Sequence, residues 1–299
     1  MSTRALAILA LLLTMILWGS AAVFLRTLAL SLSPENSLAL RNAIFIPINI
    51  AGLALFGTWR IRREHWRPFL IAGLVGMGGY SWFVNAGFAL VPAGLGTIIN
   101  MAQPIMIALL AWAILHEKPS PWIWLGVGVA ITGAVVLFWD DITAAVPLRG
   151  VIFLLISCAG WAVYAIYAKP LLQSYDTFTV TAVTILIAAP MLIAAASEPL
   201  PVLAARLSLR QWLEILYLVV PCGILGVMMW NYGAKHLSSA ATGSFLYLIP
   251  VIAVICGALM LDEPITVNIL MGGALILAGV AAAQFGPAMQ RMLFVTVPK

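Results

Sequence analysis

The run from Ala5 to Leu25, ALAILALLLTMILWGSAAVFL, is 21 residues long and carries no charged side chain. A helix needs roughly 20 apolar residues to cross the hydrocarbon core of a bilayer. Arg4 before the run and the small residues Gly19 to Ala22 within it imitate a secretory signal, but the apolar character continues beyond the usual length of a signal core. We interpret this run as an uncleaved first transmembrane helix.

Runs of the same kind fill the 299-residue chain, which is 64% hydrophobic and 8% charged. Soluble domains average roughly 25% charged residues, so an ordinary water-soluble protein is excluded. Apolar residues occupy every face of the runs, which favours lipid-embedded helices over alternating strands. The predicted fold class is an all-α integral membrane protein with ten transmembrane helices. Their segments are Ala5–Leu25, Leu38–Gly57, Phe69–Leu90, Leu95–Leu115, Trp122–Trp139, Gly150–Ala168, Phe178–Ala196, Trp212–Gly233, Ala241–Leu261 and Ile265–Phe285.

The basic residues predict the orientation of these helices. Ten of the 15 Lys and Arg residues lie at the termini or in even-numbered loops, and five lie in or beside odd-numbered loops. Because positive residues are retained on the cytoplasmic side, we expect both termini in the cytoplasm. The net charge of +5 does not indicate nucleic acid, since basic residues cluster only between apolar runs, at Arg60, Arg62, Arg63 and Arg67.

Metal, redox and common enzymatic chemistry find no support in the sequence. Its cysteines and histidines stand singly, without the spacing of a metal site or a disulfide framework. Phosphate-binding glycine loops and nucleophile motifs are also missing. We expect no metal, no cofactor and no catalytic residue. The residues concerned are Cys158, Cys222, Cys256, His65, His116 and His236.

Two registers of internal similarity relate the halves of the chain. An offset of 143 aligns Trp18 with Trp161, Arg26 with Lys169 and Pro47 with Pro190; an offset of 146 aligns Pro104 with Pro250, Glu117 with Glu263, Gly126 with Gly272 and Gly133 with Gly279. A repeat of five spans is odd, so its second copy must enter the membrane from the opposite side. The prediction is an inverted repeat of residues 1–146 and 147–299, typical of secondary carriers. The alternative is a duplication retained only for packing.

The Trp18-Gly19 pair, the prolines Pro104 and Pro250, and the turns LHEKP at 115–119 and LDEP at 261–264 resemble the drug/metabolite transporter superfamily, in its bacterial ten-helix branch. Within that branch the sequence is most similar to amino-acid exporters, including those for aromatic amino acids. The resemblance implies a carrier in the bacterial inner membrane. It also implies a central cavity between the first four helices of each repeat, with the fifth and tenth helices at the periphery.

Polar and aromatic side chains inside the spans are the candidate substrate-binding groups, because such groups are costly in lipid without partners. Aromatic rings would enclose the apolar part of a solute, and amides and a hydroxyl would bind its polar end. Helix packing and interhelical hydrogen bonding are the alternatives. The candidates are Trp18, Tyr80, Trp161, Tyr164 and Tyr247 for the first role and Asn100, Gln103 and Ser244 for the second.

Prolines within spans are candidate hinges, because each removes a backbone donor and bends its helix. They are Pro47, Pro104, Pro190, Pro221 and Pro250, and static kinks are the alternative reading. Three cations near span ends, Arg26, Arg41 and Lys169, could bind a substrate carboxylate or extend to the lipid headgroups. The acids Glu117 and Glu263 are assigned to helix ends.

The sequence thus predicts a secondary transporter that exports amino acids, aromatic ones included, by alternating access in the lipid bilayer. A broad-specificity drug or metabolite efflux carrier is the first alternative, and a membrane-embedded enzyme or receptor is the second. The partner is a small-molecule substrate, with no nucleic acid. The exact substrate, the coupling ion and the oligomeric state are left open.

Overall fold

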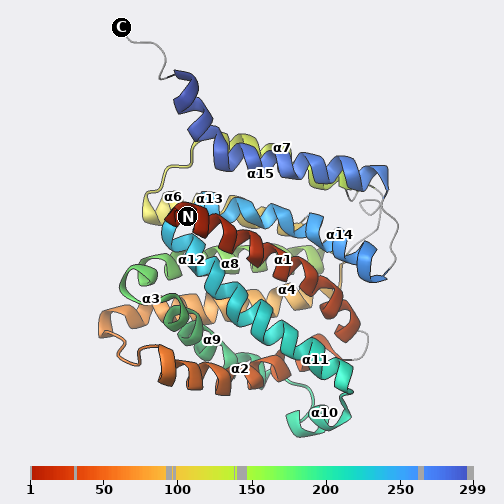
Figure 1. Cartoon of the computed structure of the whole chain (residues 1–299). Helices are drawn as coiled ribbons and strands as arrows, with labels where there is room; N and C mark the ends of the chain where they lie inside the picture. The colour runs from red at the N-terminus through yellow and green to blue at the C-terminus, as the bar shows by residue number, and fades with distance from the viewer. Residues whose placement is uncertain are drawn as a thin grey trace.

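The computed structural model describes residues 2–29, 32–91, 96, 99–137, 139, 147–261 and 266–294. Within these ranges all regular structure is helical, which confirms the all-α prediction for the described part of the chain. The helices form a layered bundle, with α1 beginning and α15 ending at the left of Figure 1.

The first half contains α1 (Thr3–Ala29), α2 (Pro34–Phe56), the 3-10 turn η1 (Arg63–His65), α3 (Trp66–Leu70), the π-helical stretch η2 (Ile71–Gly79), α4 (Tyr80–Phe88), α6 (Ala102–Leu115) and α7 (Pro121–Leu137). The second half contains α8 (Leu148–Ser174), α9 (Thr177–Ala194), α10 (Leu200–Arg206), α11 (Leu209–Tyr217), the π-helical stretch η4 (Leu218–Leu225), α12 (Gly226–His236), α13 (Ser239–Ser244), the 3-10 turn η5 (Phe245–Tyr247), α14 (Leu248–Leu261) and α15 (Val267–Phe294).

Seven helical runs in the described ranges are long and apolar enough to cross a membrane. They are Thr3–Ala21, Pro34–Phe56, Arg63–Phe88, Leu148–Ser174, Thr177–Ala194, Leu209–His236 and Ser239–Cys256. Three further apolar helices, Ala102–Leu115, Pro121–Leu137 and Leu270–Ala283, are shorter. A 14-residue helix rises only about 21 Å, less than a hydrocarbon core of about 30 Å. The chain is therefore a multi-pass membrane protein, and ten crossings stay a prediction.

Two elements differ from the expected segments. Helix α8 continues to Ser174, past the predicted end at Ala168 and through Pro170. The short α10 lies in a connection for which the sequence predicted no helix. Its second residue is a proline in the first turn, where the missing backbone N–H has no acceptor within the helix.

The five hinge candidates occupy two kinds of position. Pro47 and Pro190 lie inside α2 and α9, and Pro221 lies inside η4. Pro104 stands third in α6, in the first turn, where a backbone N–H has no intrahelical acceptor. Pro250 stands third in α14, but α13, η5 and α14 follow one another without interruption, so it lies inside the helical run Ser239–Cys256. The hinge role of the five prolines stays a prediction.

Helices α7 and α15 lie side by side at the edge of the bundle, as the upper layer of Figure 1 shows. Glycines allow their close approach. A Cβ atom on Gly126 would collide with the carbonyl of Gly279, and one on Gly133 would lie 2.7 Å from the carbonyl oxygen of Gly272. Small residues at such crossings let two membrane helices pack backbone to backbone. The pairing joins the end of one half of the chain to the end of the other.

The remaining contacts occur in matching sets between the two halves. Helix α1 packs against α12 and α14, and its counterpart α8 packs against α4 and α6. Helix α2 packs against α9, and α6 packs against α13. The two π-helical stretches, η2 and η4, occupy equivalent places in the third helical run of each half. The middle of the bundle is therefore lined by α1, η2 to α4, α8 and η4 to α12.

The α7–α15 crossing gives a stability test with an internal control. We expect Gly126→Ala to lower the free energy of unfolding by ~1–3 kcal/mol, because the added methyl group overpacks the crossing. Gly128→Ala in the same helix should be neutral or stabilising, since a Cβ there meets nothing within 4 Å. Thermal unfolding in detergent, followed by circular dichroism, measures both. Equal melting temperatures for the two variants would contradict the tight crossing.

Candidate functional site

Trp161 of α8 lies at the centre of a group of rings contributed by both halves of the chain. Its ring centroid is 5.2 Å from that of Trp18 in α1 and 5.0 Å from that of Tyr80 in α4. It is 5.1 Å from Tyr164 and 5.5 Å from Trp230 in α12. Each such pair contributes ~0.5–1.5 kcal/mol beyond area burial. We call these five residues the aromatic cluster.

Glycines bring the helices that carry the cluster close together. A Cβ on Gly76 of η2 would lie 2.8 Å from the Cα of Tyr164, and one on Gly160 of α8 would lie 3.0 Å from the backbone nitrogen of Tyr80. On the other side, a Cβ on Gly226 would lie 2.7 Å from Nε1 of Trp18. The small residues therefore decide where the rings of the cluster meet.

The indole of Trp18 is anchored by the π-helical stretch η4. Its Nε1 donates a hydrogen bond to the carbonyl oxygen of Cys222 at 3.0 Å. In an α-helix the amide of Gly226 would donate to that carbonyl, but here it donates to the carbonyl of Pro221. The wider backbone turn thus makes the Cys222 carbonyl available to a side chain of the other half.

Tyr164 is held by a fully buried polar chain. Its hydroxyl donates to Oδ1 of Asn231 at 3.0 Å, and Nδ2 of Asn231 donates to Oγ1 of Thr181 at 2.9 Å. The Thr181 hydroxyl in turn donates to the Thr177 carbonyl. The sequence analysis did not select Asn231 or Trp230 as site residues. The alignment of Asn85-x-Gly87 with Asn231-x-Gly233 and the position of Trp230 inside a span were the available signals.

The predicted amides lie beside the cluster. Gln103 is buried and hydrogen-bonds to the side chain of Tyr80. Asn100 is part-buried, and its Oδ1 accepts a contact from Sγ of Cys158 at 3.5 Å, three residues before Trp161 in α8. Gln103 therefore lies beside a residue of the aromatic cluster, and Asn100 contacts a residue that precedes Trp161 on α8.

The second predicted pair lies between α13, η5 and α6. The Tyr247 hydroxyl donates to the carbonyl of Met101 at 3.3 Å, and the Ser244 hydroxyl donates to the carbonyl of Ala241 at 2.9 Å. Both side chains are buried. The Tyr247 contact joins the two halves of the chain, whereas the Ser244 contact lies within α13, and neither is a ring contact with the aromatic cluster.

Two hydrogen-bond donors of the cluster have no acceptor among the residues that the structure describes. The Nε1 atoms of Trp161 and Trp230 are buried and unpartnered, although the two side chains are only 3% and 1% exposed. A buried donor without a partner costs ~1–3 kcal/mol. Two of them next to one another in the middle of the bundle mark a place where a ligand would supply the missing acceptors.

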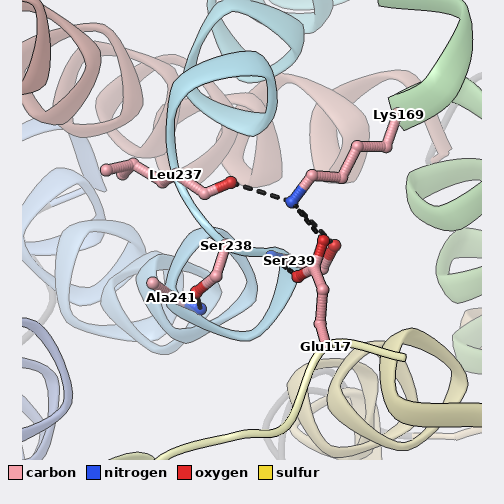
Figure 2. A network of polar contacts seen from close by, with 6 residues as sticks. All are labelled: Glu117, Lys169, Leu237, Ser238, Ser239 and Ala241. Atoms are coloured by element: carbon pink, nitrogen blue, oxygen red, sulfur yellow. Dashed lines mark hydrogen bonds and ion pairs between the residues drawn. The ribbon is translucent and has the colours of Figure 1, made fainter. Parts of the chain in front are cut away.

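An ion pair between Lys169 and Glu117 joins both halves of the chain (Figure 2). Nζ of Lys169 in α8 lies 2.7 Å from Oε1 of Glu117, which follows α6, and donates to the Leu237 carbonyl at 2.9 Å and to the Ser239 hydroxyl at 3.2 Å. The backbone N–H of Ser239 donates to Oε2 of Glu117 at 2.8 Å. His116, at φ 56°, turns the chain so that Glu117 reaches this network. We call it the Glu117–Lys169 latch.

Two pockets lie away from the aromatic cluster. One pocket, of about 220 Å³, is lined by residues around Asn36 and Glu198, and a second, of about 330 Å³, by residues around Lys118 and His236. None of the predicted binding residues lines either. Among the described residues no group of His, Cys, Asp or Glu side chains could hold a metal ion. Glu263 lies outside the described residues, and the side chain of Arg26 is not described.

The model of the EamA-like transporter family matches residues 5–139 and again residues 148–283. The chain belongs to this family. An "Uncharacterized transporter" of Archaeoglobus fulgidus is 25% identical over 272 residues, 90% of this chain and 95% of its own length. A "Probable terminal-alkyne amino-acid exporter" of Streptantibioticus cattleyicolor is 28% identical over 284 residues, 92% of each chain. A crystal structure with a TM-score of 0.78 and 22% identity covers 94% of this chain and 98% of that chain, which shows the fold alone.

An EamA-like chain is a membrane transporter for a small-molecule substrate and not an enzyme, as the sequence analysis predicted. The resemblance to the drug/metabolite transporter superfamily is confirmed at the level of the family. The family match leaves the substrate open, so the assignment of the binding residues rests on their geometry.

The buried polar chain predicts a measurable coupling energy. We expect Asn231→Ala to destabilise the protein by ~1–3 kcal/mol, because it leaves the hydroxyls of Tyr164 and Thr181 with lost partners. In the Tyr164→Phe background the same change should cost less, because one of these hydroxyls is then already removed. A double-mutant cycle of thermal unfolding in detergent measures this difference. Strictly additive losses would contradict the hydrogen-bonded chain.

Proposed function

We propose that this EamA-like protein is a secondary carrier that exports amino acids, aromatic ones included, from the cytoplasm. The observation that carries the proposal is the aromatic cluster, which offers both stacking surfaces and two unpartnered indole donors. Rings bind the apolar side chain of such a solute, and the donors bind its polar end. The exporter of Streptantibioticus cattleyicolor supports the substrate class.

The carrier mechanism proposed here is alternating access between two inverted five-helix repeats, 1–146 and 147–299. Three observations support it. The family model matches twice, at 5–139 and 148–283. The helix contacts occur in matching sets, and the α7–α15 crossing pairs Gly126 with Gly279 and Gly133 with Gly272. At an offset of 146 each of these glycine pairs becomes the other, as a two-fold axis between the repeats requires. The five hinge candidates would absorb the motion.

The Glu117–Lys169 latch is the proposed closure of the cytoplasmic end. Lys169 stands eight residues after Trp161 on α8, so the latch lies about 12 Å along the same helix from the cluster. Its partners come from the α6–α7 and α12–α13 connections, on opposite halves. The positive-inside rule places this end, where α1 begins, in the cytoplasm of a bacterial inner membrane. The latch holds the cytoplasmic entrance shut in this conformation.

Transport itself is tested in proteoliposomes loaded with a radiolabelled panel of amino acids. We expect saturable efflux of aromatic and large apolar amino acids, and at least a tenfold fall in kcat/KM for Trp161→Ala, because the central ring contacts four others. Trp112→Ala, whose ring is 56% exposed on α6, is the matched control and should keep near-normal transport. Equal losses in the two variants would count against the cluster as the binding site.

The same assay separates the alternative function. A broad-specificity efflux carrier would use the same rings to hold unrelated apolar compounds, with no preference for amino acids. Efflux of apolar drugs that amino acids fail to inhibit would favour this alternative. Repeating the assay with and without a pH gradient then shows whether protons drive the transport.

Breaking the latch should open the cytoplasmic end. Glu117→Gln removes one charge of a part-buried pair, and we expect a shift of ~1 kcal/mol, or about fivefold, toward the open state. The measurement is the labelling rate of a cysteine introduced at Ala240, which is 5% exposed behind the latch, with a membrane-impermeant thiol reagent. Glu64→Gln, which breaks the exposed Arg62–Glu64 pair, is the control. Unchanged labelling in Glu117→Gln would exclude the latch as a gate.

A further inference from the structure

Arg41 is a cation inside the membrane-spanning helix α2, eighth from its start and about 10 Å along its axis. Its Nε donates a long hydrogen bond, 3.4 Å, to the carbonyl of Ser37. Among the described residues no carboxylate lies within ion-pairing distance of its guanidinium. A charged side chain at such a depth is costly, and in membrane proteins it marks a substrate or ion path.

The Arg41 side chain belongs to the interior face of α2. Phe45, one turn further along the same face, packs its ring against Gly223 of η4. The Arg41 guanidinium lies in the neighbourhood of the side chains of Cys222 in η4 and Tyr80 in α4. The side chain is also part-buried within the protein. Arg41 therefore points between the two π-helical runs.

Tyr80 and Cys222 connect Arg41 to the aromatic cluster. The Tyr80 ring lies 5.0 Å from that of Trp161, and the Cys222 carbonyl accepts the hydrogen bond of Trp18. The unpartnered indole donors of Trp161 and Trp230 belong to the same cluster. In the described part of the chain, Arg41 has no carboxylate partner and the two indole N–H groups have no acceptor, and Tyr80, Cys222 and Trp18 link these three donors.

The site has no matching negative charge in the described part of the chain. Most of the acids described there lie at helix ends and in loops, and Glu214, the sixth residue of α11, is paired with Arg210 at 3.0 Å. The others are Glu35, Glu64, Glu117, Asp176 and Glu198. A ligand's anionic end would find three donors here, whereas its ammonium group would find no carboxylate.

We propose that Arg41, together with the indole N–H groups of Trp161 and Trp230, binds the carboxylate of the substrate, and that the site recognises aromatic carboxylates whether or not they carry an amino group. This inference rests on the proposed transport function and deepens it. Guanidinium–carboxylate hydrogen bonds are charge-assisted and directional, so they orient the solute with its ring on the aromatic cluster. The substrate class therefore includes aromatic carboxylates that lack an amino group, and it excludes aromatic amines that lack a carboxylate.

The test is competition against radiolabelled phenylalanine in proteoliposomes of the full chain. The competitors are 3-phenylpropanoate, which lacks the amine, and 2-phenylethylamine, which lacks the carboxylate. We expect 3-phenylpropanoate to compete within about threefold of unlabelled phenylalanine, and 2-phenylethylamine to be at least about tenfold weaker. A wild-type protein that accepts the amine as well as the acid overturns the proposal.

Variants locate the preference at the named residues. Arg41→Gln should raise the KM for phenylalanine about tenfold or more and erase the preference for the acid, whereas Arg41→Lys should keep part of it. Trp161→Phe keeps an aromatic ring and removes only the N–H donor, so it should raise the KM for the acid about threefold and leave the amine unchanged. Arg149→Gln, which removes an arginine 5.1 Å from the Phe153 ring, is the control and should change neither. An unchanged preference in Arg41→Gln overturns the proposal.

Binding measured by tryptophan fluorescence in detergent separates this inference from the proposed function. If phenylalanine is not transported but 3-phenylpropanoate quenches the fluorescence of the wild type and not of Arg41→Gln, amino-acid export is wrong and the carboxylate site stands. If phenylalanine is transported and the acid and the amine bind equally, export stands and the carboxylate site is wrong. Circular dichroism of Arg41→Gln and Arg41→Lys shows whether each variant is folded, and Trp161→Phe repeats the test without changing the charge.

Discussion

Lipid offers no hydrogen-bond partner to a peptide group or a polar side chain, so each such group in a membrane span must find one inside the protein. The helices satisfy this requirement for the backbone. Buried side chains such as Thr14, Asn42 and Thr184 satisfy it by donating to carbonyls of their own helix, at hydrogen-bond distances of 2.8 to 2.9 Å. Five buried side-chain atoms in the described part of the chain do not satisfy it, and two of them, the indole nitrogens of Trp161 and Trp230, belong to neighbouring rings of the aromatic cluster.

The π-helical stretches explain how the bundle builds a site without opening its backbone. In η4 the amide of Gly226 donates to the carbonyl of Pro221 rather than to that of Cys222. The indole of Trp18, from the other half, donates to the Cys222 carbonyl instead. In η2 the corresponding stretch lets Tyr164 pack on Gly76. A wider turn changes which face of the helix points inward, so the rings of both halves meet at one place.

The sequence predicted the helices well because length and apolarity are sufficient for a membrane span, and it selected four of the five cluster residues because interior aromatics are uncommon enough to notice. It missed Trp230 and Asn231, since an evenly apolar helix does not reveal which face points inward. It did not distinguish Pro104, in the first turn of α6, from Pro250, inside the run Ser239–Cys256, because a proline at a helix start and one in its middle look alike within a continuous apolar run. No periodicity indicated η2 or η4.

Charge links the site to the motion proposed for it. Water solvates the positive charge of Arg41 when the site is open. Closing the empty site removes that water and supplies no anion in its place, so closure of the empty carrier is costly. A bound carboxylate neutralises that charge and supplies acceptors to the two indoles, which makes the closed, dry state less costly. In this proposal closure is favoured by substrate rather than by an acidic residue in a span. The Glu117–Lys169 latch, which shares helix α8 with Trp161, is the proposed link between the site and the cytoplasmic end.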